Sequence, residues 1–464
     1  MKRYLSGFLI IIFVFISFNV KSNNCYSLVN SKELKPNFVV SQMGGDLDFK
    51  IKFYEAIDLF NFDYFDQALP IFLQLLALDK NNCNVNFYVG VCYLKSSLKR
   101  TLAIPYLEKA IKKTDAAYSY THKEIASPVF SYQYLGEAYH ANFQFDEALK
   151  NYEIFKSFLT DKSRDANFML EIDRNIEVTK FAKELYAKPL KNVEIIPMKI
   201  ANSDFSDYTP CFSPSKTMMY FTSKRKGGSG NIQAPEGGIA DDIYYLEFKN
   251  NKWIKPKKLG SKICGGDIDV LNQISFDGNQ LYFTRANKGY MDIFYCVLGA
   301  KNKWSQPKKL SPIINTKDNE KGAFMTQDGN TLYFVSDRLG GYGGYDIYIS
   351  ERKSNGEWGQ PRNLGQEVNS QYDEDFPYVL PDGVTLYFSS LGHNSMGGYD
   401  IFTSTLSENG KWSKPDNIGY PINTPFDDVS FSISVDGKKG YYASGKQGGY
   451  GELDIYEINF TGVK

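Results

Sequence analysis

The sequence has little of what catalysis requires. Its 464 residues include three histidines, His122, His140 and His393, and contain neither the G-x-S-x-G turn of serine hydrolases nor a phosphate-binding P-loop. Lysine plus arginine and aspartate plus glutamate number 53 each, so no net charge favours nucleic acid as a partner. We therefore expect a protein that is not an enzyme, uses no cofactor and binds no nucleic acid.

Cysteine is also scarce. The six cysteines, at positions 25, 83, 92, 211, 264 and 296, are too few and too scattered for a disulfide framework in a chain of this length. No pair has the C-x-x-C spacing that is typical of zinc ligands, so we expect no metal site there. Most are predicted to be buried as small hydrophobic residues, and the sequence leaves any disulfide pairing open.

A long apolar run occurs once, at the N-terminus. The stretch from Tyr4 to Val20 follows two basic residues, which predicts a signal peptide over 1–22. It is shorter than the roughly 20 residues that span a bilayer, which favours cleavage over an uncleaved anchor. The mature chain is expected to have no transmembrane segment and to lie in the periplasm or peripherally on the outer membrane. Lipidation of Cys25 is the alternative, but "SNNC" lacks the small residue expected before a lipidated cysteine.

From 46 to 186 the apolar residues recur at three- and four-residue intervals, which predicts helices. Small residues stand twelve positions apart at Ala56 and Ala68, and again at Gly136 and Ala148, where two antiparallel helices can touch closely. This pattern resembles the tetratricopeptide repeat, a helix hairpin of about 34 residues. The signature tryptophan of that family is absent, and a generic helical bundle is the alternative.

The resemblance implies three hairpins and a capping helix over 164–186. Stacks of this type form a groove that holds a peptide or a partner protein. We therefore expect the helical part to bind a protein segment rather than to catalyse a reaction.

From 192 to 464 the chain changes to short strand-like runs and glycine-rich turns, and one pattern recurs. Asp-Ile pairs mark five copies, at Asp242, Asp292, Asp346, Asp400 and Asp454, of which the last three are 54 residues apart. Trp-x-x-Pro segments keep the same spacing, at Trp253, Trp304, Trp358 and Trp412. Repeats of about 50 residues with four short strands predict a β-propeller, here with five blades.

The two ends of this region complement each other. The fifth copy has no Trp-x-x-Pro strand, whereas an extra stretch, 192–200, precedes the first copy. Asn202 stands eight residues before Pro210, as Asn369 stands eight before Pro377, so the extra stretch falls where a blade should finish. We therefore expect 192–200 to close the last blade, which removes two exposed sheet edges.

These repeats resemble the WD40-like propeller repeats of periplasmic proteins, of the kind also found in the translocation protein TolB. Tetratricopeptide-like helices followed by such a propeller look like periplasmic proteins of Bacteroidota that serve outer-membrane and type IX secretion assemblies. Those proteins add an OmpA-like domain, whereas this sequence ends at Lys464 with the propeller, so direct anchoring to peptidoglycan is not expected. The resemblance implies a multidomain exported scaffold, all-α and then all-β, that binds protein partners in the cell envelope.

A glycan-binding propeller or a propeller glycosidase is the alternative function. A glycosidase needs two carboxylates that face each other across the sugar, and Asp373, Glu374 or Asp427 could supply them. A deep central pocket with unpaired carboxylates and exposed aromatic side chains would favour the glycosidase. A broad, shallow rim would favour the scaffold.

The repeated Gly-Gly-Tyr-Asp stretch, at 343–346 and 397–400, is predicted to be architectural, because a catalytic residue is needed once and not in successive blades. The glycine pair is expected to supply a positive φ, and the aspartate to accept hydrogen bonds from turn amides. The tryptophans are expected to pack between blades rather than to bind sugar.

Positions where one blade departs from the others are candidates for a partner-binding rim. Arg285 stands where the other copies have serine, and the first copy carries an insertion over 224–241. Acidic clusters between blades are expected on the same rim, as solvated or turn-bonding carboxylates rather than as a Ca²⁺ site. The candidate rim residues are Lys224, Arg225, Arg285, Arg338, Tyr342, Asp373 and Glu374.

Overall fold

The computed structural model describes residues 45–462, apart from positions 97, 228–239, 266–267, 288 and 435. The predicted signal peptide, 1–22, and Cys25 lie outside these residues. Within the described ranges, no helix has both the length and the apolar character needed to span a membrane. The chain separates into two compact units, one ending at Ala138 and one beginning at Tyr139, so the division falls within helix α5 (Phe130–Ala141).

The first unit is helical and has an aromatic core. Phe72 stacks on Tyr88 with ring centroids 4.9 Å apart, and Phe53 meets both rings edge-on. Ala56 and Ala68 are fully buried, on two helices that pack together. The predicted helices are therefore present, while their tetratricopeptide type stays a prediction. The elements are α1 (Gly45–Asn61), α2 (Phe65–Leu78), α3 (Cys83–Lys95), η1 (Arg100–Ala103), α4 (Ile104–Ala110), β1 (Thr114–Asp115), β2 (Ser127–Pro128) and most of α5.

The second unit begins with the end of α5 and continues with α6 (Phe145–Phe158) and α7 (Ala166–Tyr186). These two helices pack against each other, because α6 buries Tyr152 and α7 buries Ile172 on facing apolar stripes. The final helix expected over 164–186 is α7.

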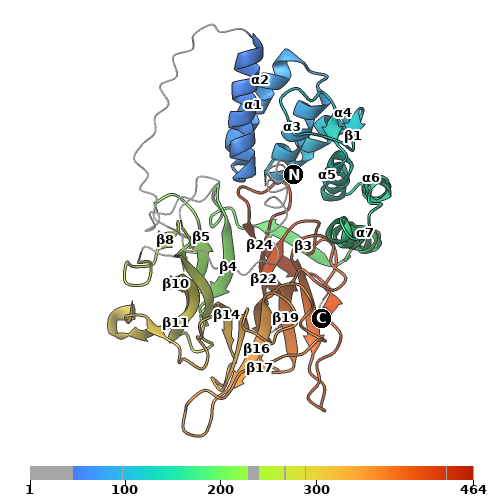
Figure 1. Cartoon of the computed structure of the whole chain (residues 1–464). Helices are drawn as coiled ribbons and strands as arrows, with labels where there is room; N and C mark the ends of the chain where they lie inside the picture. The colour runs from blue at the N-terminus through green and yellow to red at the C-terminus, as the bar shows by residue number, and fades with distance from the viewer. Residues whose placement is uncertain are drawn as a thin grey trace. The chain divides into compact units, whose positions relative to one another are not determined.

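Five antiparallel sheets follow, and Figure 1 colours them from green to red in chain order. The first strand of each sheet contacts the first strand of the next, and the fifth contacts the first, so the sheets are blades around a ring. The blade strands are β4 (Asp207–Phe212), β5 (Met218–Ser223), β6 (Asp242–Lys249), β7 (Lys252–Trp253) and β8 (Lys257–Lys258); β9 (Asp269–Ile274), β10 (Gln280–Asn287), β11 (Tyr290–Gly299), β12 (Lys303–Trp304) and β13 (Lys308–Lys309), with η2 (Ala300–Asn302) between β11 and β12; β14 (Glu320–Met325), β15 (Thr331–Ser336), β16 (Asp346–Glu351) and β17 (Arg362–Asn363); β18 (Glu374–Val379), β19 (Thr385–Ser390), β20 (Asp400–Thr405) and β21 (Asp416–Asn417); and β22 (Asp428–Ile433), β23 (Lys439–Ser444), β24 (Asp454–Phe460) and β3 (Val193–Pro197).

The ring is closed by its two ends, as the sequence predicted. Strand β3 pairs antiparallel with β24, and Tyr456 lies opposite Pro197. In Figure 1 the green β3 lies beside the red β24. A five-bladed β-propeller preceded by helices is therefore confirmed.

The tryptophans pack between blades, which confirms the prediction made for them. Trp304 lies against Tyr220 of the preceding blade, with ring centroids 6.4 Å apart, and Trp412 lies against Tyr333 at 6.5 Å. Trp358 is 6% exposed in a cluster that also contains Tyr282 of the preceding blade. Blades two, three and four therefore each bury their outer tryptophan on the preceding blade.

The glycine pair of the Gly-Gly-Tyr-Asp stretch has a different role from the predicted one. Asp346 accepts hydrogen bonds from the amides of Tyr342 and Gly343, as expected. Neither Gly343 nor Gly344 has a positive φ, so that part of the prediction was wrong. A Cβ on Gly343 would lie 2.1 Å from the carbonyl oxygen of Tyr372. The glycines are needed because the next blade approaches the backbone closely.

Buried asparagines join consecutive blades. Asn369 accepts a hydrogen bond from the Ile347 amide at 2.8 Å and donates one to the Ile347 carbonyl at 3.0 Å. Asn315 and Asn423 hold the corresponding isoleucines in the same manner. Each side chain satisfies both polar groups of a buried backbone position.

Replacing Asn369 by alanine is expected to lower the free energy of unfolding by about 2 kcal/mol, because it leaves the buried Ile347 amide without a partner and removes one of the two hydrogen bonds to the Ile347 carbonyl. Urea unfolding of the two proteins measures the change. Asn355→Ala, at an exposed turn of the same blade, is the control and should change stability much less. Equal losses in the two variants would contradict the inter-blade role.

Candidate functional site

Each inner strand of the propeller begins with a buried carboxylate. These residues are Asp207, Asp269, Glu320, Glu374 and Asp428, all fully buried. Three of them bind an arginine of their own blade. Arg225 lies 2.6 Å from Asp207, Arg285 lies 2.6 Å from Asp269, and Arg338 lies 3.1 Å from Glu320. The predicted rim arginines thus form ion pairs with buried carboxylates of their own blades.

Arg285 follows this common pattern rather than departing from it. Arg225 and Arg338 come two residues after the serine that ends the second strand, whereas Arg285 replaces that serine itself. Its guanidinium nevertheless reaches the equivalent carboxylate. Arg285 therefore pairs with the inner-strand carboxylate of its blade from a different sequence position. Its role in partner binding stays a prediction.

In blade five Lys446 stands in place of the arginine and interacts with Asp428, whereas blade four has no cation at the equivalent position. Gly392 stands where blade three has Arg338, and a Cβ there would lie 2.2 Å from the Ser370 hydroxyl. Glu374 instead accepts hydrogen bonds from the Ser370 amide and hydroxyl and from the Ser390 hydroxyl. Burial without a neighbouring cation raises the pKa of Glu374 to about 7. The symmetry of the ring is broken here.

Helix α7 covers this exceptional blade. The Arg174 guanidinium stacks 3.9 Å from the centroid of the Tyr372 ring and donates to the carbonyl of Leu391. Met396, fully buried, packs on the end of the helical segment, and His140 Nε2 donates to its carbonyl at 2.7 Å. Burial lowers the pKa of His140 to about 4, so the ring is neutral near pH 7.

The remaining predicted rim residues lie at the same end of the ring. Asp373 accepts a hydrogen bond from the Tyr345 amide of the preceding blade at 3.0 Å. Lys224 follows β5 directly and is half-buried. The Tyr342 side chain is 51% exposed and is open to a partner. The structure thus brings the predicted residues to one end of the ring, but the three arginines pair with carboxylates of their own blades and Asp373 joins two blades.

A cavity of about 600 Å³ occupies the opposite end of the central channel. All five inner strands line it, and aromatic side chains gather there. The lining aromatic residues are Phe212, Trp253, Phe276, Phe324, Phe376, Tyr378, Phe431 and Tyr441. Charged residues among the described lining are Lys216, Lys439 and Asp436, near the exposed edge. This volume lies within the range of about 300–1,000 Å³ found for ligand sites.

Bulges in the inner strands shape this cavity. The pairing of β4 with β5 shifts between Tyr208 and Cys211, and that of β18 with β19 shifts between Asp375 and Tyr378. Within these bulges Thr209 has φ 54° and Phe376 has φ 50°, which non-glycine residues seldom adopt. The sequence analysis missed this site; the signal was the aromatic residue near the end of most inner strands.

The carboxylates considered for a glycosidase do not line the cavity. Glu374 is fully buried, while Asp373 and Asp427 accept hydrogen bonds from the amides of Tyr345 and Tyr399. Over the described ranges, no group of three histidine, cysteine or acidic side chains is placed to hold a metal ion. The described cysteines are free thiols, and four of the five are buried, as predicted for small hydrophobic residues.

No protein-family model matches the chain, and no curated protein matches it. Among solved structures, TolB from Acinetobacter baumannii is similar at 17% identity and a TM-score of 0.36, over 57% of each chain. A putative TolB from Agrobacterium tumefaciens has 14% identity and a TM-score of 0.31, over 58% of this chain and 97% of that one. An α-L-arabinofuranosidase from Lactobacillus brevis has 14% identity and a TM-score of 0.37, over 57% and 92%. The fold assignment rests on the strand pairing described above.

Proposed function

We propose that this protein is a non-enzymatic exported adaptor that binds protein partners in a cell-envelope assembly, related to the outer membrane or to type IX secretion. The observation that carries the proposal is the aromatic cavity in the channel. Its lining is mainly apolar, and half-buried rings such as Phe276 and Tyr378 offer the contact area that protein interfaces favour.

The same lining supports a role in binding rather than in glycoside hydrolysis. Glycosidases use two carboxyl groups on either side of the scissile bond. Asp436 is the one carboxylate among the described residues that line the cavity. A cavity of this composition is better suited to an apolar segment of a partner than to a sugar undergoing hydrolysis.

The helical part is proposed to be a tetratricopeptide-type stack that holds a second protein segment. The predicted signal over 1–22 supports a periplasmic location, peripheral to the outer membrane. Because the two binding sites are proposed in different domains, changes at one should have little effect on the other. The candidate rim residues, led by the exposed Tyr342, remain a second surface for partners of the propeller.

The cavity is tested by the double variant Phe276→Gln with Phe376→Ser. Each replacement is found at the matching position of another blade, Gln327 and Ser430, so the ring is expected to fold. Cross-linked envelopes containing the full chain are purified, and partners are quantified by mass spectrometry. We expect at least one partner to be recovered about tenfold less, which corresponds to about 1.4 kcal/mol of lost binding energy.

Tyr290→Ser is the matched control and should keep every partner, because it removes an exposed aromatic residue that lines neither the cavity nor the candidate rim. Unchanged recovery of every partner by the folded double variant would contradict a binding role for the cavity. Hydrolysis of a glycan at an enzymatic rate by the purified chain would contradict the non-enzymatic proposal.

A further inference from the structure

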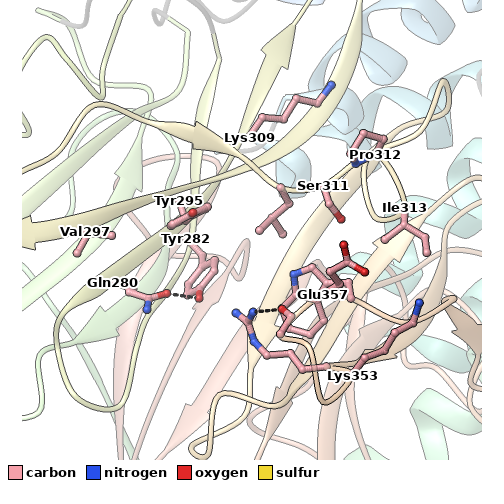
Figure 2. A pocket seen from close by; sticks show the side chains of 14 residues that line it. Gln280, Tyr282, Tyr295, Val297, Lys309, Ser311, Pro312, Ile313, Lys353 and Glu357 are labelled. Atoms are coloured by element: carbon pink, nitrogen blue, oxygen red, sulfur yellow. Dashed lines mark hydrogen bonds between the residues drawn. The ribbon is translucent and has the colours of Figure 1, made fainter.

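A second cavity, a groove of about 650 Å³, lies between blades two and three, and none of its lining residues belongs to the central cavity. Figure 2 shows Tyr282 and Tyr295 on one side of the groove and Lys353 and Glu357 on the other. Ile313, from the connection between the two blades, forms a third side. The groove is large enough for a short stretch of chain.

An arginine in this groove replaces the apolar residue that other blades use. The cross-strand partner of the outer tryptophan is Phe248 in blade one, Leu298 in blade two and Leu406 in blade four. In blade three the same place, opposite Trp358, is taken by Arg352. Packing on the tryptophan does not require a charge, because three blades achieve it without one.

The Arg352 side chain is held in a defined position. Its guanidinium lies 4.3 Å from the centroid of the Trp358 ring. Nε donates to the Gly329 carbonyl at 2.9 Å, and Nη1 donates to the Gly356 carbonyl at 3.1 Å. Nη2 has no hydrogen bond to any residue in the described part of the chain. A guanidinium fixed on its stem and open at its outer edge is suited to a carboxylate, because little side-chain entropy is lost on binding.

The other lining residues indicate the kind of ligand. Lys353 adds a second cation, whereas the Lys309 ammonium is already paired with Asp292 at 2.7 Å. Tyr282 is 3% exposed and the face of Trp358 is covered by Arg352, so neither offers a free ring on which a sugar could stack. Tyr295 has one face stacked on Tyr282, with ring centroids 6.1 Å apart. Val297, 38% exposed, provides apolar contact area.

We propose that the groove between blades two and three binds an extended acidic peptide segment of a protein partner. One carboxylate of the segment pairs with Arg352 and a second lies near Lys353, while an intervening apolar side chain contacts Val297 and Ile313. The inference rests on the proposed adaptor function and adds the chemistry of one partner segment. Arginine and carboxylate form two parallel hydrogen bonds when the geometry is open, which gives the contact its specificity.

The test uses the full mature chain and a fluorescein-labelled hexapeptide in which glutamate alternates with leucine. Saturable binding is expected, and it should weaken as salt is added. The double variant Arg352→Leu with Lys353→Ser should bind at least tenfold more weakly. Both replacements copy blade four, which has Leu406 and Ser407, so the variant is expected to fold. Lys411→Ser removes an exposed lysine from the blade-four hairpin and should bind as the unaltered chain does.

The inference is overturned by no binding by the unaltered chain, by equal binding by the double variant, or by equal binding of a peptide with glutamine in place of glutamate. Binding of a galacturonate oligomer in place of the peptide would identify an acidic glycan as the ligand and overturn it as well. Partner recovery from cross-linked envelopes separates the two proposals. If the double variant keeps every partner, the groove inference fails while the adaptor function stands.

Discussion

Replacing Glu374 by glutamine is expected to stabilise the protein at pH 8 by on the order of 2 kcal/mol. Burial raises the pKa of this carboxyl to about 7, well above its ordinary value. As pH rises from about 4 to 7, the unfolded chain loses this proton while the folded chain keeps it, so stability falls across that window. Glutamine cannot ionise, so the variant does not show this fall in the free energy of unfolding.

Glutamine can also keep the hydrogen bonds that Glu374 makes. Its carbonyl oxygen accepts from the Ser370 amide, and its amide group donates to the hydroxyls of Ser370 and Ser390, which serve as acceptors in turn. Urea unfolding at pH 8 and pH 5 measures the effect, and the difference between the two proteins should shrink at pH 5. A variant less stable than the parent at pH 8 would contradict this explanation.

Glu320→Gln in blade three is the matched comparison and should gain less stability at pH 8, or none. Burial raises the pKa of Glu320 as well, but hydrogen bonds from Thr316 and the Arg338 guanidinium oppose that rise. Removing the carboxylate charge also deprives Arg338, whose side chain is 14% exposed, of its ion-pair partner. A gain as large as that of Glu374→Gln would mean that the neighbouring cation makes no difference.

Gly343→Ala is expected to destabilise the protein by about 3 kcal/mol or more, because the added Cβ would overlap the backbone of the next blade. Its nearest neighbours would be the carbonyl oxygens of Tyr372, at 2.1 Å, and Ser370, at 2.7 Å. Backbone atoms held in a blade cannot move aside as a flexible side chain can. Thermal unfolding and urea unfolding measure the change.

Gly260→Ala provides the comparison for this substitution. No atom lies within 4 Å of the position that its Cβ would take, and its φ is not positive. Its stability should therefore stay the same or rise by a few tenths of a kcal/mol. A loss in Gly260→Ala as large as that in Gly343→Ala would mean that close approach of the next blade is not the cause.

Sequence spacing predicted the ring because its signals are local and repeated. The Asp-Ile pairs, such as Asp346 with Ile347, recur at constant intervals, and the missing outer strand of blade five identified the closing strand. The role of Gly343 could not be seen in this manner, since the atom that requires it belongs to Tyr372 in another blade. Spacing shows that a residue recurs, but not what lies against it.

The candidate sites were harder to predict than the fold for two physical reasons. The carboxylate partner of Arg285 lies sixteen residues earlier on another strand, so a pair of internal charges looked like an exposed rim. The aromatic cavity depends on bulges at residues such as Thr209 and Phe376, and a bulge changes which side chains face the channel. Strand alternation gives no sign of a bulge.

The closing strand also affects the order in which the protein can fold. The Ile455 amide in β24 bonds to Asn202, 253 positions earlier in the chain, just after β3. Contacts between residues so far apart in the sequence form slowly. The chain loses the entropy of closing the long intervening loop before such a contact can stabilise the fold. Until β24 has been synthesised, β3 has no strand to pair with, and the edge of blade five is missing. A chain with this topology has to be kept from pairing with other strands until its last segment is available, which makes the interval before closure the stage most prone to aggregation.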